Sequence, residues 1–98
     1  IDPDNMEGLA GAGIVHALSG QTASAEECLQ RALDQLPLAR REKRAELLRW
    51  MGEVRLRQNR LEEAAEYFEE ALALNSDLVE SRRRLEQLRA RDIVEFGR

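Results

Sequence analysis

Residues 48–72 read LRWMGEVRLRQNRLEEAAEYFEEAL, and this stretch carries two helical patterns in succession. The first pattern comprises Leu48, Met51, Gly52 and Arg55. The second comprises Leu61, Ala64, Ala65, Phe68, Ala71 and Leu72. In both, neighbouring members are three or four residues apart or adjacent, which places them on one side of a helix. Asn59 lies between the patterns, and asparagine tolerates the left-handed backbone that a tight turn needs. The stretch therefore predicts two antiparallel helices.

The same pattern occurs 39 positions earlier in the chain. The matched pairs are Leu9 and Leu48, Gly13 and Gly52, Ala25 and Ala64, Leu29 and Phe68, Ala32 and Ala71, and Leu33 and Leu72. Small residues recur at small positions, where two helices must approach closely, and large residues recur at large ones. Asp2-Pro3 and Leu36-Pro37 are separated by only 34 positions, which indicates a five-residue insertion within residues 39–44.

Both copies resemble the tetratricopeptide repeat (TPR), whose signature is W-x2-L-G-x2-Y…A-x3-F…P. The second copy reads Leu48-x2-Met51-Gly52-x2-Arg55, then Ala64-x3-Phe68-x2-Ala71, with Ser76 in place of the proline. The first copy reads Leu9-x2-Ala12-Gly13-x2-His16, then Ala25-x3-Leu29-x2-Ala32 and Pro37. The resemblance implies an all-α fold, an α-solenoid of TPR helical hairpins with about five helices in a right-handed superhelical stack.

The repeat divides the chain into five segments. We expect residues 1–4 to end a preceding repeat, 5–38 to form TPR unit 1, 39–44 to be a basic insertion that extends the next helix, 45–78 to form TPR unit 2, and 79–98 to form a capping or partial third-repeat helix. The helix formers of the insertion predict that the third helix runs from about Leu38 to Arg57. The last helix is expected from Leu78 to about Arg91. The residues after Arg91 either extend it or begin another unit.

The last helix carries a polar face. Leu85 takes the position that Met51 holds one repeat earlier, whereas the neighbouring positions hold Arg82 and Glu86. A polar outer face is what a terminal capping helix needs. At the other end, three glycines weaken the first helix, and we expect that helix to fray.

Composition excludes several classes of function. The 98 residues carry a formal net charge of −4, which argues against nucleic-acid binding through bulk charge. Cys28 and His16 are the only cysteine and the only histidine, so we expect no internal disulfide, no metal site and no cofactor. No run approaches the roughly 18 apolar residues of a membrane span, so membrane insertion is not expected. The single cysteine is compatible with the cytosol and the periplasm alike, and the cytoplasm is slightly favoured.

No residue set predicts catalysis. Gly11-Ala12-Gly13 lacks the preceding strand of a phosphate-binding loop. His16 has no assignable nucleophile and is expected to be half-buried opposite the second helix. Cys28 is flanked by glutamates, which favours an inert, partly buried thiol. The glutamates of residues 62–70 are interpreted as a solvated outer face. We therefore expect the chain not to be an enzyme.

Trp50 is the most informative candidate for partner binding, because it lies off the packing stripe of its helix. TPR arrays, by resemblance, line a concave groove with the first helix of each repeat. That resemblance predicts the partner-binding residues Ile14, Arg49, Trp50, Glu53, Arg57, Arg83, Arg84 and Gln87, beside Ala10 and Ala17. A large aromatic side chain among arginines is typical of a binding hot spot. The alternative is that the extended helix or a flanking repeat covers Trp50.

The leading hypothesis is a non-catalytic module, part of a longer protein, that binds a protein, peptide or helix in this groove. The arginines of residues 82–84 alternate with acidic residues and lack stacking aromatics, which favours an acidic protein or peptide over RNA. The carboxylate clamp of chaperone-binding TPR domains is not matched. The alternatives are a structural spacer or self-association scaffold acting through exposed repeat ends, and an accessory domain of an enzyme.

Overall fold

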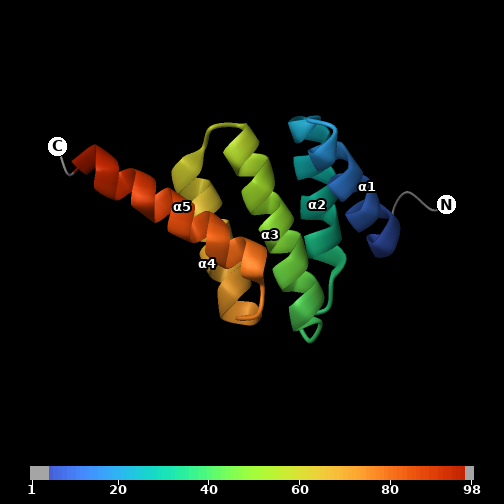
Figure 1. Cartoon of the computed structure of the whole chain (residues 1–98). Coiled ribbons are helices and arrows are strands. Elements are labelled where there is room, and N and C mark those ends of the chain that lie inside the picture. The colour runs from blue at the N-terminus through green and yellow to red at the C-terminus, as the bar shows by residue number, and fades with distance from the viewer. Residues whose placement is uncertain (1–4, 97–98) are drawn as a thin grey trace.

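The computed structural model describes residues 5–96, with side-chain burial for residues 5–91. This part of the chain contains five helices and no strand (Figure 1). The helices are α1 (Met6–Leu18), α2 (Thr22–Gln35), α3 (Arg41–Arg57), α4 (Leu61–Leu74) and α5 (Val79–Phe96). The all-α helical repeat predicted from the sequence is confirmed. The expected end of a preceding repeat, residues 1–4, lies outside the described residues.

The helices follow one another across the molecule in chain order (Figure 1). α1 and α2 form one antiparallel hairpin, α3 and α4 form the second, and α5 packs against α4. α3 joins the two hairpins because it also packs against α2 and, less extensively, α1. The resulting body measures 52 × 28 × 17 Å, the elongated shape expected when each unit contacts only its neighbours.

Glycine sets the distance between the helices within each hairpin. A Cβ atom on Gly52 would lie 2.6 Å from Cε1 of the fully buried Phe68 of α4. A Cβ atom on Gly13 would lie 2.7 Å from Cγ of Leu29 of α2. These distances are too short for any side chain, so the close approach of helices predicted at both glycines is confirmed.

The two hairpins turn in the same way. Asn59 has φ 61° and Gly20 has φ 81°, so each turn contains a residue with left-handed backbone. In the second turn, the backbone N–H of Arg60 donates to the carbonyl of Arg55 at 2.9 Å. In the first, the N–H of Gln21 makes the equivalent bond to the carbonyl of His16, also at 2.9 Å. This bond closes the end of a helix in the Schellman manner, and the prediction for Asn59 is confirmed.

The insertion is partly helix and partly turn. α3 begins at Arg41, so the predicted extension is correct for residues 41–44 and wrong for residues 38–40. The chain turns there because it must reverse direction after α2, and the N–H of Arg40 donates to the carbonyl of Pro37 at 3.0 Å.

Arg44, in the helical part of the insertion, caps the end of α2. Its Nη2 donates to the carbonyl of Leu36 at 3.0 Å and approaches that of Leu33 at 3.5 Å. A cation at this position satisfies carbonyls that have no partner within the helix and suits the negative end of its dipole. The insertion therefore joins the two hairpins as well as lengthening α3.

The predicted last helix is present and continues past Arg91 to Phe96. Leu85 is buried, whereas Arg82 and Glu86 are exposed, as expected for a helix with a polar outer face. The helical backbone through Phe96 agrees with the first of the two alternatives for the chain end, a continued helix. Gly97 and Arg98 lie outside the described residues.

Candidate functional site

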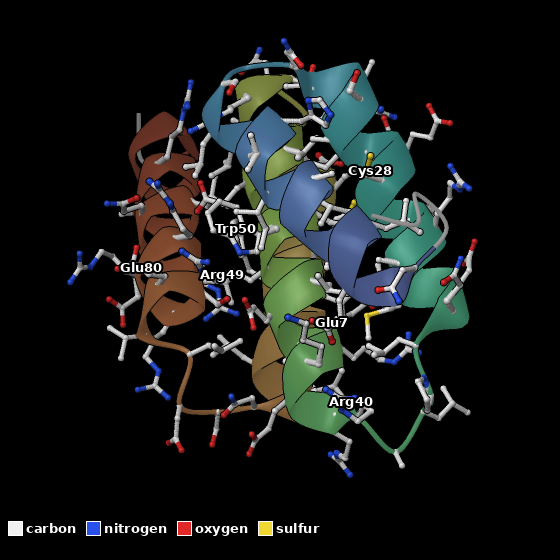
Figure 2. All side chains as sticks on the ribbon, turned by 90° about the vertical axis from the view of Figure 1, so that its right-hand side faces the viewer. Glu7, Cys28, Arg40, Arg49, Trp50 and Glu80 are labelled. Carbon is white, nitrogen blue, oxygen red and sulfur yellow. The ribbon has the colours of Figure 1, made fainter. Side chains whose placement is uncertain are left out.

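Trp50 lies near the middle of α3, on the side of that helix toward α5 (Figure 2). Its ring is half-buried and packs against the core formed by α1, α2 and α3. The guanidinium carbon of Arg49 lies 4.5 Å from the centroid of the ring. A cation this close to the face of an indole is attracted by the ring quadrupole, so the two side chains hold each other in place. Tryptophan and arginine together form a small platform that remains partly exposed.

Glu53 and Arg84 connect α3 to α5 directly. The Nε atom of Arg84 donates to Oε1 of Glu53 at 2.8 Å, and its Nη2 donates to Oε2 at 3.3 Å. Glu53 is only 7% exposed, and a paired, hydrogen-bonded carboxylate tolerates such burial. The sequence predicts that both residues contact a partner. In the structure they bind each other, which positions α5 beside Trp50.

The other predicted residues differ in exposure. Arg57, Arg83 and Gln87 are exposed, and Ile14 is half-buried. Arg83 lies 3.6 Å from Glu80 and Gln87 accepts a hydrogen bond from Arg84 at 3.4 Å, so neither is fully free.

The expectation that Ala10 and Ala17 line the groove is wrong. Both are buried, at 2% and 0% exposure, and belong to the core cluster that contains Leu47, Met51 and Val54 of α3. Small side chains at these positions let α1 lie against the next hairpin. The surface around Trp50 is therefore narrower on the α1 side than the sequence indicated.

An open hollow of about 960 Å³ adjoins Arg49, and the sequence did not predict it. One wall comes from residues 39–43, Glu46 and Arg49; the other comes from Asn75 and residues 77–80. Figure 2 shows the wall residues Arg40, just before the start of α3, Arg49 on α3 and Glu80 on α5. The one sequence feature that could have indicated this hollow is the insertion, because it lengthens α3 beyond the start of α5. The hollow places charges of both signs around an opening that continues from the Trp50 platform.

Arg55 has a structural role away from this surface. It replaces the tyrosine of the repeat signature, and its Nη2 lies 2.6 Å from Oε1 of Glu26 in α2. Its Nε lies 3.8 Å from Glu63 in α4, and Gln58 accepts a further bond from its Nη1 at 2.8 Å. The hydrogen bond from Arg55 lowers the pKa of Glu26, against the smaller effect of partial burial. The same hydrogen bond raises the pKa of Arg55.

The equivalent position of the first hairpin holds His16. It is half-buried, as predicted, and its Nδ1 lies 2.6 Å from Oε1 of Gln21. This contact links the end of α1 to the start of the next helix. Cys28, on α2, is a free and partly buried thiol.

Among residues 5–91 no group of three or more histidine, cysteine, aspartate or glutamate side chains is arranged to hold a metal ion. Within the part of the chain that the structure describes, no helix combines the length and the apolar character needed to span a bilayer.

Comparison with known proteins gives one match. Residues 6–77 match a family model described as a tetratricopeptide repeat, a range that contains all of α1 to α4. No curated protein and no solved structure matches the chain.

Proposed function

The chain belongs to the tetratricopeptide repeat family, and from that premise we propose that it is a non-catalytic module that binds a peptide or partner helix beside Trp50. Repeats of this family generally mediate protein–protein interaction, and the family is typically non-catalytic. The surface that we propose for this binding comprises the exposed sides of α3 and α5 around Trp50, with Ile14 at its α1 edge.

The single observation that carries this proposal is the platform of Trp50 and Arg49. Trp50 is the only tryptophan of the chain and remains partly exposed although it packs against the core. Tryptophan, tyrosine and arginine side chains are enriched at binding hot spots. A tryptophan ring buries a large area, and with two side-chain torsions it loses little conformational entropy. Here the stacked arginine already restricts the ring, which reduces the entropy lost when a partner binds.

Two further features support the same surface. The Glu53–Arg84 pair holds α5 against α3, so the two walls are positioned before any partner arrives. The hollow beside Arg49 leaves room for a chain to continue beyond the platform. A rigid surface with an apolar centre and a polar surround is the usual anatomy of a peptide-binding site.

The test begins with a phage-displayed library of random 12-residue peptides, panned against the 98-residue chain. Affinities of enriched peptides are then measured by fluorescence polarisation for the parent, Trp50→Ala and Leu38→Ala. Leu38 is the matched control because it is an apolar residue, 81% exposed, in the turn before α3. We expect Trp50→Ala to weaken binding about 30-fold, from a hot-spot cost of about 2 kcal/mol, and Leu38→Ala to leave it unchanged.

A second readout uses the unmodified protein. Because Trp50 is the only tryptophan, its fluorescence reports the site directly. A bound peptide should protect it from quenching by acrylamide. Equal affinity of the parent and Trp50→Ala, together with unchanged quenching, would contradict the proposal and favour a spacer or scaffold role.

A further inference from the structure

The charges on the α3 side of this surface are not balanced. Within residues 5–91, Arg84 pairs with Glu53, Arg83 with Glu80, and Lys43 with Glu46. Neither Arg49 nor Arg57 makes an ion pair with any residue in this range. The guanidinium of Arg49 lies over the ring of Trp50. The surface around Trp50 therefore carries two guanidinium groups without a carboxylate partner among the described residues.

Their spacing along α3 defines a register. Arg49 and Arg57 are eight residues apart in one continuous helix, a rise of about 12 Å. Trp50 and Arg57 are seven residues apart, which is two helical turns, so they project from the same side of α3. A peptide in extended conformation advances about 3.3 Å per residue and would cover this distance in about four residues.

Carboxylates fit two such arginines well. The planar guanidinium donates two parallel hydrogen bonds to a carboxylate, a geometry that adds specificity to the charge attraction. The formal net charge of −4 does not prevent this, because at physiological salt charges farther than about 8 Å are largely screened. Local unpaired charge therefore decides which peptides are accepted.

The hollow beside Arg49 is not expected to favour acidic peptides. Arg40 and Arg41 line it, but Glu42 and Asp77 line it as well and offset them. The selective contacts are thus confined to the middle and the C-terminal end of α3.

We propose that the Trp50 surface selects acidic peptides: an apolar side chain of the peptide rests on Trp50, and two carboxylates about four residues apart bind Arg49 and Arg57. This inference rests on the proposed function but makes a separate claim about the partner. It specifies the chemistry of the ligand, namely an acidic segment with an apolar residue between its carboxylates.

The peptides selected from the random library test it first. We expect those that depend on Trp50 to be enriched in Asp and Glu, with pairs of acidic residues three to five positions apart. Trp50-dependent peptides that are neutral or basic would overturn the acidic preference and leave the proposed function standing. Peptides that bind independently of Trp50 would overturn both.

Arginine variants then test the register with an enriched acidic peptide. Arg49→Gln and Arg57→Gln should each weaken binding about three-fold, and the double variant about ten-fold. Arg89→Gln removes the same charge from an exposed position of α5 that faces Glu69 of α4, and should change the affinity less than about 1.5-fold.

The same measurements with a peptide that carries Gln in place of its acidic residues complete a double-mutant cycle between the arginines and the peptide carboxylates. Against this peptide, Arg57→Gln should lose no affinity relative to the parent. Arg49→Gln should lose less affinity than it does with the acidic peptide, because only the stacking on Trp50 is then removed. Equal losses for the acidic and the neutral peptide would overturn the inference, because the arginines would then act without contacting carboxylates.

Discussion

Gly52 and Phe68 show how a single residue determines the spacing of two helices. The buried ring of Phe68 occupies the volume that any Cβ at position 52 would need. In the first hairpin Gly13 and Leu29 repeat this arrangement. Both contacts involve a small residue on the first helix and a large one on the second, so the pair as a unit determines the geometry.

We predict that Gly52→Ala destabilises the protein by about 2 kcal/mol, because overpacking a full core outweighs the gain in helix propensity. Gly11→Ala is the matched control. Gly11 is exposed in α1, and a Cβ atom added there would have no neighbour within 4 Å, so the alanine should stabilise by about 0.5–1 kcal/mol. Urea denaturation followed by circular dichroism measures both. An unchanged midpoint for Gly52→Ala would show that α4 can move away without cost.

Pairs of helices are joined by buried or half-buried arginines. Arg44 caps α2 from α3, Arg55 connects α3 to Glu26 of α2, and Arg84 connects α5 to α3. Each guanidinium provides several donors in a fixed plane, which allows one side chain to hold two elements in a defined orientation. The contact between Arg55 and Glu26 links the two hairpins and has a consequence for pH.

Because the folded-state pKa of Glu26 is lowered from its ordinary value of 4.5, its contribution to stability is present above about pH 4.5 and is lost as pH falls through the folded-state value. We predict that Glu26→Gln is less stable than the parent at pH 7. The difference should shrink progressively below about pH 4.5, in urea denaturation measured at several pH values.

Glu27→Gln is the control for this series, since Glu27 is the adjacent carboxylate, is exposed and makes no ion pair with another described residue. A stability difference for Glu26→Gln that stays constant from neutral pH down to about pH 3 would contradict the assigned role of the Arg55 contact.

The whole molecule is an elongated stack with its most buried helix at the centre. α3 contributes eight buried residues, more than any other helix among the described residues, and contacts both hairpins. α1 has no helix on its outer side among residues 5–96. Its Val15 is 61% exposed, whereas Val54, the equivalent residue of α3, is fully buried.

We predict that amide hydrogen exchange is slowest in α3 and at least about ten-fold faster in α1, because a stack of this kind opens from its ends. The three glycines of α1 at positions 8, 11 and 13 also weaken this helix and should speed its exchange. Exchange measured residue by residue by NMR tests the gradient. Equal protection in α1 and α3 would show that the stack unfolds as one cooperative unit.

Several features could be predicted from the sequence because they depend on local spacing. Helical periodicity, the recurrence of small and large residues, and the asparagine turn are read along the chain, and the five helices, the Gly52–Phe68 contact and Asn59 agree with them. Helical periodicity also identified Trp50 as a candidate for partner binding, since its position off the packing stripe is a property of one helix.

Other features were decided only by the tertiary structure. Glu53 and Arg84 are 31 residues apart and meet because α5 packs against α4, the partner of α3 in the second hairpin. Ala10 and Ala17 are buried because α1 lies against the next hairpin, and the hollow exists because the lengthened α3 extends past the start of α5. Each depends on how elements pack across the stack. Periodicity assigns a residue to a face of its helix, whereas packing determines what that face meets.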